Sequence, residues 1–192
     1  MIKNNFKKII SLVIVVVTLL SSLCLTSCKR QDEEETKRIV AELVDRSYDL
    51  NRIYYGDGLS YDEKFERETG YYLVSEKERF QTRFDLETET RAVFSDSISN
   101  ELIRTYFDGY ESLGVARYAR YIEGSDGFIS VYKDYDQAIE NEIYKFDTSV
   151  IEIEKNSRNT IVARVLCKTT NQMVEIYLVH EAYGWRLDSP TY

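Results

Sequence analysis

The chain has little of the chemistry on which most catalytic and metal sites depend. Its 192 residues include one histidine, three cysteines and one proline. A serine or cysteine nucleophile normally needs a base within reach, and His180 is the only imidazole in the sequence. Neither the Cys and His spacings of zinc sites nor a glycine-rich phosphate loop occurs. The composition therefore predicts a protein without metal, without cofactor and without enzymatic activity.

Positive charge is also scarce. The sequence has 25 Lys and Arg residues against 33 Asp and Glu residues, which gives a formal net charge of -8. Nucleic-acid binding needs a basic patch, so DNA and RNA are excluded as expected partners. Hydrophobic residues make up 43% of the chain, which is enough for a packed core and argues against disorder.

The N-terminus has the pattern of a secretory signal peptide. Three lysines among the first eight residues precede an uncharged run over residues 9–25. The run ends in Leu25-Thr26-Ser27-Cys28, which resembles the lipobox of bacterial lipoproteins. That resemblance implies cleavage before Cys28 and a diacylglycerol on its thiol. An uncleaved membrane anchor is the alternative, because about 17 to 25 apolar residues can span a bilayer. Both interpretations predict an extracytoplasmic domain tied to the bacterial cell membrane, because the lysines precede the apolar run.

These observations predict three parts: a lipoprotein signal peptide over 1–27, an acidic tether over 28–35 and a single α+β domain over 36–192. The tether would continue into an acidic first helical turn. With Cys24 removed and Cys28 lipidated, Cys167 is the one thiol left in the domain. It alternates with Val165 and Ala163 in a strand-like run, which predicts a buried core residue.

The first half of the domain has helical patterns. Apolar residues recur at helical spacing over 36–55, and the glycines at 56 and 58 end that pattern. Thr82 and Asp85 have the spacing of a capping box, which predicts a second helix, and a third is expected over about 98–106. A short strand is expected over 71–74.

The second half alternates with a period of two. A glycine-rich turn over 124–127 between residues 115–123 and 128–133 predicts a β-hairpin. Further strands are expected over 143–154, 160–169, 173–180 and 185–188, with a short helical piece near 137–141. The apolar phase slips between Val150 and Ile151, which predicts a bulge. The expected fold is α+β, with N-terminal helices packed on a curved antiparallel β-sheet meander.

Few residues qualify for a site. His180 ends a core-facing strand pattern, which predicts a hydrogen-bonded structural histidine. The carboxylate pairs Glu87/Glu89 and Asp134/Asp136 could serve a glycosidase only if they met in a cleft, and a solvated surface is expected instead. Tyrosines are more informative, because Tyr offers a large contact area with a polar tip. Four tyrosines lie in or beside the predicted hairpin: Tyr118, Tyr121, Tyr132 and Tyr135. They could form a recognition surface, or part of the group could be buried in the core.

The order of several segments resembles one known family. The segments are Tyr54-Tyr55-Gly56, Tyr71-Tyr72-Leu73-Val74, Glu78 to Leu86, Tyr121-Ile122-Glu123 with Asp126-Gly127, and Glu181 to Asp188. Together they resemble the bacterial DL-endopeptidase inhibitors (IseA-like), which are exported and bind the cysteine peptidases that cut peptidoglycan stem peptides. The resemblance implies an inhibitor that inserts a loop into the active-site cleft.

The hairpin tip is the candidate loop, because it is short, polar and flanked by tyrosine. Its predicted partner-binding residues are Glu123, Gly124, Ser125, Asp126 and Gly127, with Tyr121 beside them. An acidic protein would favour encounter with basic wall-associated enzymes.

A second interpretation is a small-ligand-binding lipoprotein. The strands ending in a Gly-Trp turn are also similar to the cone-shaped domains of the nuclear-transport-factor-like superfamily, whose shape carries many functions. An open apolar cavity would favour this alternative. A carboxylate enzyme, the third possibility, would need two acidic groups converging in a cleft.

Overall fold

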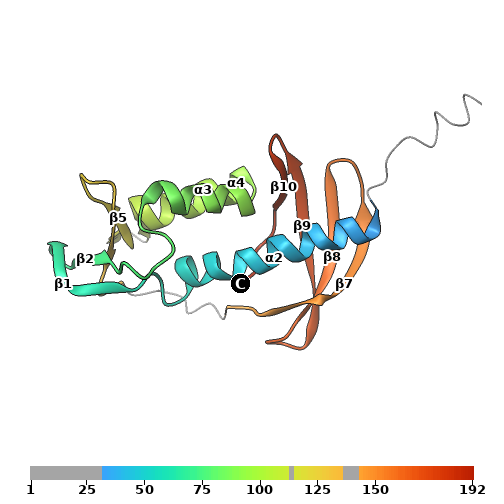
Figure 1. Cartoon of the computed structure of the whole chain (residues 1–192), viewed down its shortest axis with the longest axis horizontal. Coiled ribbons are helices and arrows are strands. Elements are labelled where there is room, and N and C mark those ends of the chain that lie inside the picture. The colour runs from blue at the N-terminus through green and yellow to red at the C-terminus, as the bar shows by residue number, and fades with distance from the viewer. Residues whose placement is uncertain (1–31, 113–114, 136–142) are drawn as a thin grey trace, which may run out of the picture. The chain divides into compact units, whose positions relative to one another are not determined.

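One long helix, α2 (Glu33–Tyr55), runs between the two larger sheets of the domain (Figure 1). The computed structural model describes residues 32–112, 115–135 and 143–192, and residues Glu33–Tyr192 form one compact unit. The predicted signal peptide, Cys28 and the helical piece near 137–141 lie outside the described residues. Among the described helices, none has the length and apolar character needed to cross a membrane.

Helix α2 buries one face, as its spacing predicts. Val40, Leu43, Val44 and Leu50 are buried in the core. The first turn carries three glutamates, which favour the positive end of the helix dipole, and Lys37 pairs with Glu33 at 3.0 Å. The last three residues of the expected tether are therefore already helical.

The first half of α2 packs against a meander of four antiparallel strands in the order β10-β9-β8-β7. The strands are β7 (Phe146–Asn156), β8 (Thr160–Cys167), β9 (Gln172–Glu181) and β10 (Gly184–Leu187). In β8 every second residue is buried, so one face meets the helix and the other meets solvent. The β7 register shifts between Asp147 and Ile151, which confirms the predicted bulge.

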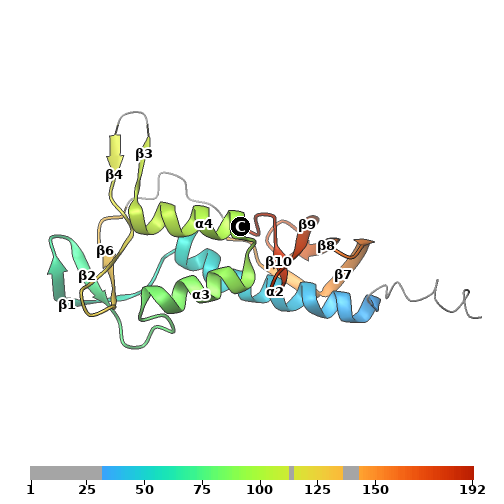
Figure 2. The ribbon, with the colours of Figure 1, turned by 90° about the horizontal axis from the view of Figure 1, so that it is seen from above.

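A second antiparallel sheet lies by the C-terminal end of α2, with the order β1-β2-β6-β5. It comprises β1 (Tyr61–Glu68), β2 (Tyr71–Val74), β5 (Tyr121–Glu123) and β6 (Ile129–Tyr132). Strands β3 (Tyr110–Ser112) and β4 (Val115–Arg117) pair with each other as a separate ribbon, which projects from the end of α4 (Figure 2).

Helices α3 (Arg83–Val93) and α4 (Asp96–Ile103) lie side by side along α2 in both views, and a π-helical turn, η1 (Arg104–Asp108), follows α4 (Figures 1 and 2). Thr82 caps α3 as predicted, because its Oγ1 accepts a hydrogen bond from the Asp85 amide at 3.1 Å. The Ser95 amide donates to the Leu187 carbonyl oxygen at 2.8 Å, which ties the helix pair to β10.

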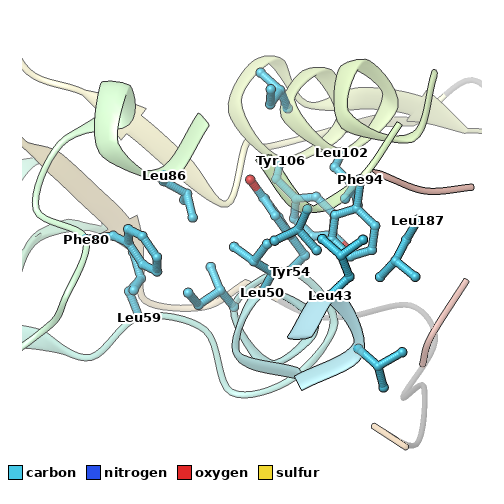
Figure 3. Close-up of a cluster of buried hydrophobic side chains, with 14 of the residues drawn as sticks. Leu43, Leu50, Tyr54, Leu59, Phe80, Leu86, Phe94, Leu102, Tyr106 and Leu187 are labelled. Carbon is cyan, nitrogen blue, oxygen red and sulfur yellow. The ribbon is translucent and has the colours of Figure 1, made fainter. Parts of the chain in front are cut away.

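The core is one continuous cluster that joins the helices to both sheets. Figure 3 shows Leu50 and Tyr54 of α2 together with Leu86 of α3 and Tyr106 of η1 among the buried side chains. The α+β class with helices packed on antiparallel strands is confirmed. Two details differ from the prediction: the 121–132 hairpin belongs to its own sheet, and the polar segment Tyr61–Glu68 forms a strand. Six of its eight residues are charged, which hid the strand, but main-chain pairing with β2 does not require an apolar face.

Candidate partner-binding surface

The turn between β5 and β6 is a tight polar loop. The Gly124 amide donates to the Phe128 carbonyl oxygen at 2.9 Å, and the Gly127 amide donates to the Gly124 carbonyl oxygen at 2.9 Å. The side chains of Glu123, Ser125 and Asp126 are exposed, so the predicted loop presents three polar side chains to solvent.

An ion pair holds this turn to strand β1. Nη1 of Arg67 lies 2.6 Å from Oδ2 of Asp126, and the Phe128 amide donates to Oδ1 of Asp126 at 3.2 Å. Arg67 and these amide contacts keep the pKa of Asp126 below its usual range. A Cβ on Gly124 would lie 2.9 Å from Arg67 Nη1, so glycine leaves room for the ion pair. The turn is thus a restrained loop, not a loose tip.

Exposed phenylalanines flank the turn. Phe128 is 40% exposed, Phe84 in the first turn of α3 is 76% exposed and Phe65 of β1 is 57% exposed. A β-bridge between Thr82 and Phe128 brings the start of α3 beside the turn, and Phe65 stands two residues before Arg67 on the same strand. We call the turn 123–127 with Phe65, Phe84 and Phe128 the hairpin-end surface. Its three phenylalanines were not predicted as site residues, although a ring among polar and charged neighbours, as at Phe84, is the signal that could have indicated exposure.

The base of the hairpin is fixed to the end of α2. Arg120 Nη1 donates to the Tyr54 carbonyl oxygen at 2.9 Å and Nη2 donates to the Gly56 carbonyl oxygen at 2.7 Å. Both carbonyls lie at the C-terminal end of α2, where side-chain donors can cap the helix. Its guanidinium also lies 5.2 Å from the Tyr135 ring centre. Arg120 therefore acts as a buried cap that joins β5 to α2.

Tyr121 is buried, so its predicted place in the partner-binding loop is wrong. Its hydroxyl donates to the Ile53 carbonyl oxygen at 2.7 Å and accepts from the Leu59 amide at 3.3 Å. Burial raises its pKa to about 12. The side chain supports the hairpin from the core side, because residues alternate between the two faces of a strand.

The other three tyrosines divide between surface and core. Tyr118 is exposed, Tyr132 is half-buried, and Tyr135 is half-buried and packs against the core. The burial expected for part of the group is confirmed, and the recognition surface stays a prediction for the exposed Tyr118.

The remaining candidate residues have structural surroundings. Cys167 is buried, as predicted. His180 is exposed, and its ring packs edge-on against Trp185 with 5.1 Å between centres. Within the described part of the chain its ring makes no hydrogen bond, so the expectation of a hydrogen-bonded, core-facing histidine is wrong. The strand extends beyond the core at that position.

Of the candidate carboxylates, Glu87 and Glu89 are engaged in ion pairs and Asp134 is exposed. Glu87 pairs with Arg83, and Glu89 pairs with Arg46 at 2.9 Å and with Arg79 at 3.3 Å. Asp136 lies outside the described residues. In the described ranges, no group of three His, Cys, Asp or Glu residues is placed to hold a metal ion.

A cavity of about 210 Å³ lies beside the end of α2. Two arginines, Arg52 and Arg79, and two carboxylates, Asp49 and Glu78, contribute to its lining. Ligand pockets are typically about 300 to 1,000 Å³ and mostly apolar, so this cavity does not favour the small-ligand interpretation.

Comparison with known proteins gave no match: no family model, no curated protein and no solved structure matched the chain. The resemblance to the endopeptidase inhibitors therefore stays a prediction.

Proposed function

We propose that this protein is a lipid-anchored extracytoplasmic binding protein that inhibits a peptidoglycan DL-endopeptidase through its hairpin-end surface. The supporting observation is a restrained polar turn flanked by three exposed phenylalanines. Aromatic side chains are enriched in protein interfaces, and exposed rings gathered in one place are typical of interaction sites.

The position of this surface fits a tethered inhibitor. Helix α2 begins at Glu33, within the predicted tether, and its 23 residues span about 34 Å from there to Tyr55. Strands β5 and β6 lie at the Tyr55 end of the helix (Figure 1). The strands that carry the turn therefore lie at the end of α2 opposite Glu33.

The inhibition step would be occlusion of the active-site cleft. The ion pair between Arg67 and Asp126 restrains the turn before binding, so less conformational entropy is lost on insertion. No group of the turn needs to react, which agrees with a role in which the loop blocks the substrate without being cleaved.

The experiment titrates the full chain in detergent against purified DL-endopeptidases that cleave a stem-peptide substrate. Stoichiometric inhibition is expected, with at least a tenfold loss in a double variant, Phe84→Ala with Glu123→Ala. The matched control is Tyr183→Ala with Glu154→Ala, which removes an exposed ring and an exposed carboxylate from the other sheet. If folded wild-type protein inhibits none of several such peptidases, the inhibitor proposal is wrong.

Lipid anchoring has its own test. In cells, Cys28→Ser is expected to abolish incorporation of a labelled fatty acid, and Cys167→Ser is expected to retain it because Cys167 is buried in the domain. Equal labelling of both variants would contradict attachment at Cys28.

A further inference from the structure

A row of three tyrosine rings crosses the sheet β1-β2-β6-β5. The rings of Tyr71 and Tyr132 lie 5.0 Å apart between centres, and the rings of Tyr132 and Tyr118 lie 5.3 Å apart. Tyr71 and Tyr132 are direct cross-strand partners in β2 and β6. Distances in this range are those of favourable aromatic pairs. We call Tyr71, Tyr132 and Tyr118 the tyrosine row.

The row is held in place by the backbone around it. The Tyr71 hydroxyl donates to the Ala119 carbonyl oxygen at 2.8 Å, which ties its far end to the segment carrying Tyr118. Gly70 has φ +80°, and a Cβ there would lie 2.6 Å from Cε2 of Tyr132. Glycine is therefore required for the ring of Tyr132 to pack this close to the β1–β2 turn.

The outer end of the row is open to solvent. Tyr118 is 69% exposed, whereas Tyr71 is buried and Tyr132 is half-buried. The ring of Tyr118 packs against Tyr132 and is otherwise largely exposed, so a partner could contact it without disturbing the existing packing. Tyr is also a residue type that supplies large binding energies at protein interfaces.

Carboxylates border the row on strand β1. Glu68 stands opposite Tyr71 in the strand register, and its negative charge contributes to raising the pKa of Tyr71, after the larger effects of burial and of Tyr132. No ion pair joins Glu68 to any residue that the structure describes. Neighbouring Glu66 is engaged differently, because its Oε1 accepts a hydrogen bond from the Gly70 amide at 2.8 Å.

Strand β1 is also an edge of its sheet, and its residues from Glu63 to Glu68 are exposed. Four of the eight residues of β1 are acidic: Asp62, Glu63, Glu66 and Glu68. Two are basic, Lys64 and Arg67, and Arg67 is paired with Asp126. The edge therefore has an excess of negative charge beside the tyrosine row.

We propose that the tyrosine row and Glu68 bind a lysine- or arginine-bearing extended segment of the protein partner. The exposed ring face of Tyr118 attracts an ammonium or guanidinium group, and Glu68, opposite Tyr71 at the other end of the row, adds negative charge that favours a cationic segment. An acidic edge strand also disfavours acidic segments. The inference rests on the proposed function, since it names the chemistry of a partner segment that would contact the domain beside the hairpin-end surface.

The test measures binding of the full chain in detergent to immobilised peptides of alternating glycine and lysine. Peptides with glutamate or norleucine in place of lysine are the probes for charge and for apolar contact. The wild type is expected to bind the lysine peptide and neither of the others. Equal binding to the norleucine peptide would overturn the inference.

The variants separate ring from charge. Tyr118→Ala and Glu68→Gln are each expected to weaken binding of the lysine peptide about three- to fivefold, which is the size of an exposed cation–π or ion-pair contact. Tyr118→Phe is expected to bind like the wild type, because it keeps the ring. The control Tyr183→Ala removes a tyrosine that is 91% exposed in the other sheet and is expected to change nothing. Unchanged binding in Tyr118→Ala would contradict a role for the row.

Failure of this inference is distinct from failure of the inhibitor proposal. Lysine-peptide binding without inhibition of any endopeptidase would support the tyrosine row and reject the enzyme class. Inhibition that is as strong in Tyr118→Ala as in the wild type, with no peptide binding, would support the inhibitor and reject the row.

Discussion

The two four-stranded sheets of this domain are both antiparallel, but they differ in the length and exposure of their strands. In the β10-β9-β8-β7 sheet, β7, β8 and β9 have eight to eleven residues, and β8 pairs with β9 in register over its whole length, although the β7–β8 register shifts twice. The β1-β2-β6-β5 sheet has strands of three or four residues apart from β1, and the register of β1 shifts twice. The regularly paired strand β8 buries every second residue, whereas β1 leaves its last six residues exposed.

The exposed aromatic side chains follow the same division. Phe65, Phe128 and Tyr118 lie in or beside the short-stranded sheet, with Phe84 alongside at the start of α3. On the long-stranded sheet, the large exposed rings are Tyr177 and Tyr183, and Tyr177 hydrogen-bonds to Glu175. We infer that the long-stranded sheet is the scaffold and the short-stranded sheet provides the contact surfaces.

Breaking the scaffold should cost the most stability. Leu178→Ala removes a fully buried side chain of β9, and we expect the free energy of unfolding to fall by about 2 to 5 kcal/mol. Val179→Ala on the opposite face is the control and should cost much less. Urea unfolding measures both. Equal losses would mean that the two faces of β9 are not packed differently.

Breaking the joint between α2 and the short-stranded sheet should cost slightly less. Arg120→Met removes the two hydrogen bonds that the guanidinium donates to the carbonyl oxygens of Tyr54 and Gly56, and we expect a loss of about 2 to 4 kcal/mol. Arg52→Met is the matched control, because Arg52 is exposed in the last turn of α2. A buried arginine also has a desolvation cost, so a stable Arg120→Met variant would show that this cost exceeds the capping gain.

The cap of α3 provides a smaller effect at the edge of the hairpin-end surface. Thr82→Ala should lower the free energy of unfolding by about 1 kcal/mol, because the Asp85 amide loses its acceptor. Thr82→Ser keeps the hydroxyl and should behave like the wild type. If the serine variant is as unstable as the alanine variant, the methyl group and not the cap supplies the stability.

The ion pair on the turn should show a still smaller effect that depends on pH. Arg67 lowers the pKa of Asp126 in the folded state, so its stabilisation is present above the unfolded pKa and is lost as pH falls through the folded pKa. We expect the stability difference between wild type and Asp126→Asn to shrink on acidification. A difference that is constant from neutral to acidic pH would contradict this assignment.

The smallest expected change separates binding from stability. Phe84→Ser replaces a ring that is 76% exposed, so the thermal unfolding temperature should be unchanged within error. Inhibition of the endopeptidase should nevertheless weaken. A clear loss of stability would instead mean that Phe84 packs onto the domain, and the hairpin-end surface would then be smaller than proposed.

Local patterns in the sequence were sufficient for most elements. The spacing of apolar residues predicted α2, the Thr82 to Asp85 spacing predicted the start of α3, and the phase slip at Val150 predicted the bulge. Each of these is a property of a few neighbouring residues. Helix periodicity, capping and strand alternation are determined at that range, because the contacts involved join residues close together in the chain.

Tertiary structure alone decided which strands share a sheet and which side chains reach solvent. Tyr118 and Tyr121 look alike in the sequence, yet one is exposed and the other is buried with its hydroxyl bonded to Ile53. Strand β1 formed from a charged segment because β2 supplied its main-chain partners. The pairing of Arg67 with Asp126 joins residues far apart in the chain. Such contacts depend on the path of the whole backbone, which no local pattern contains.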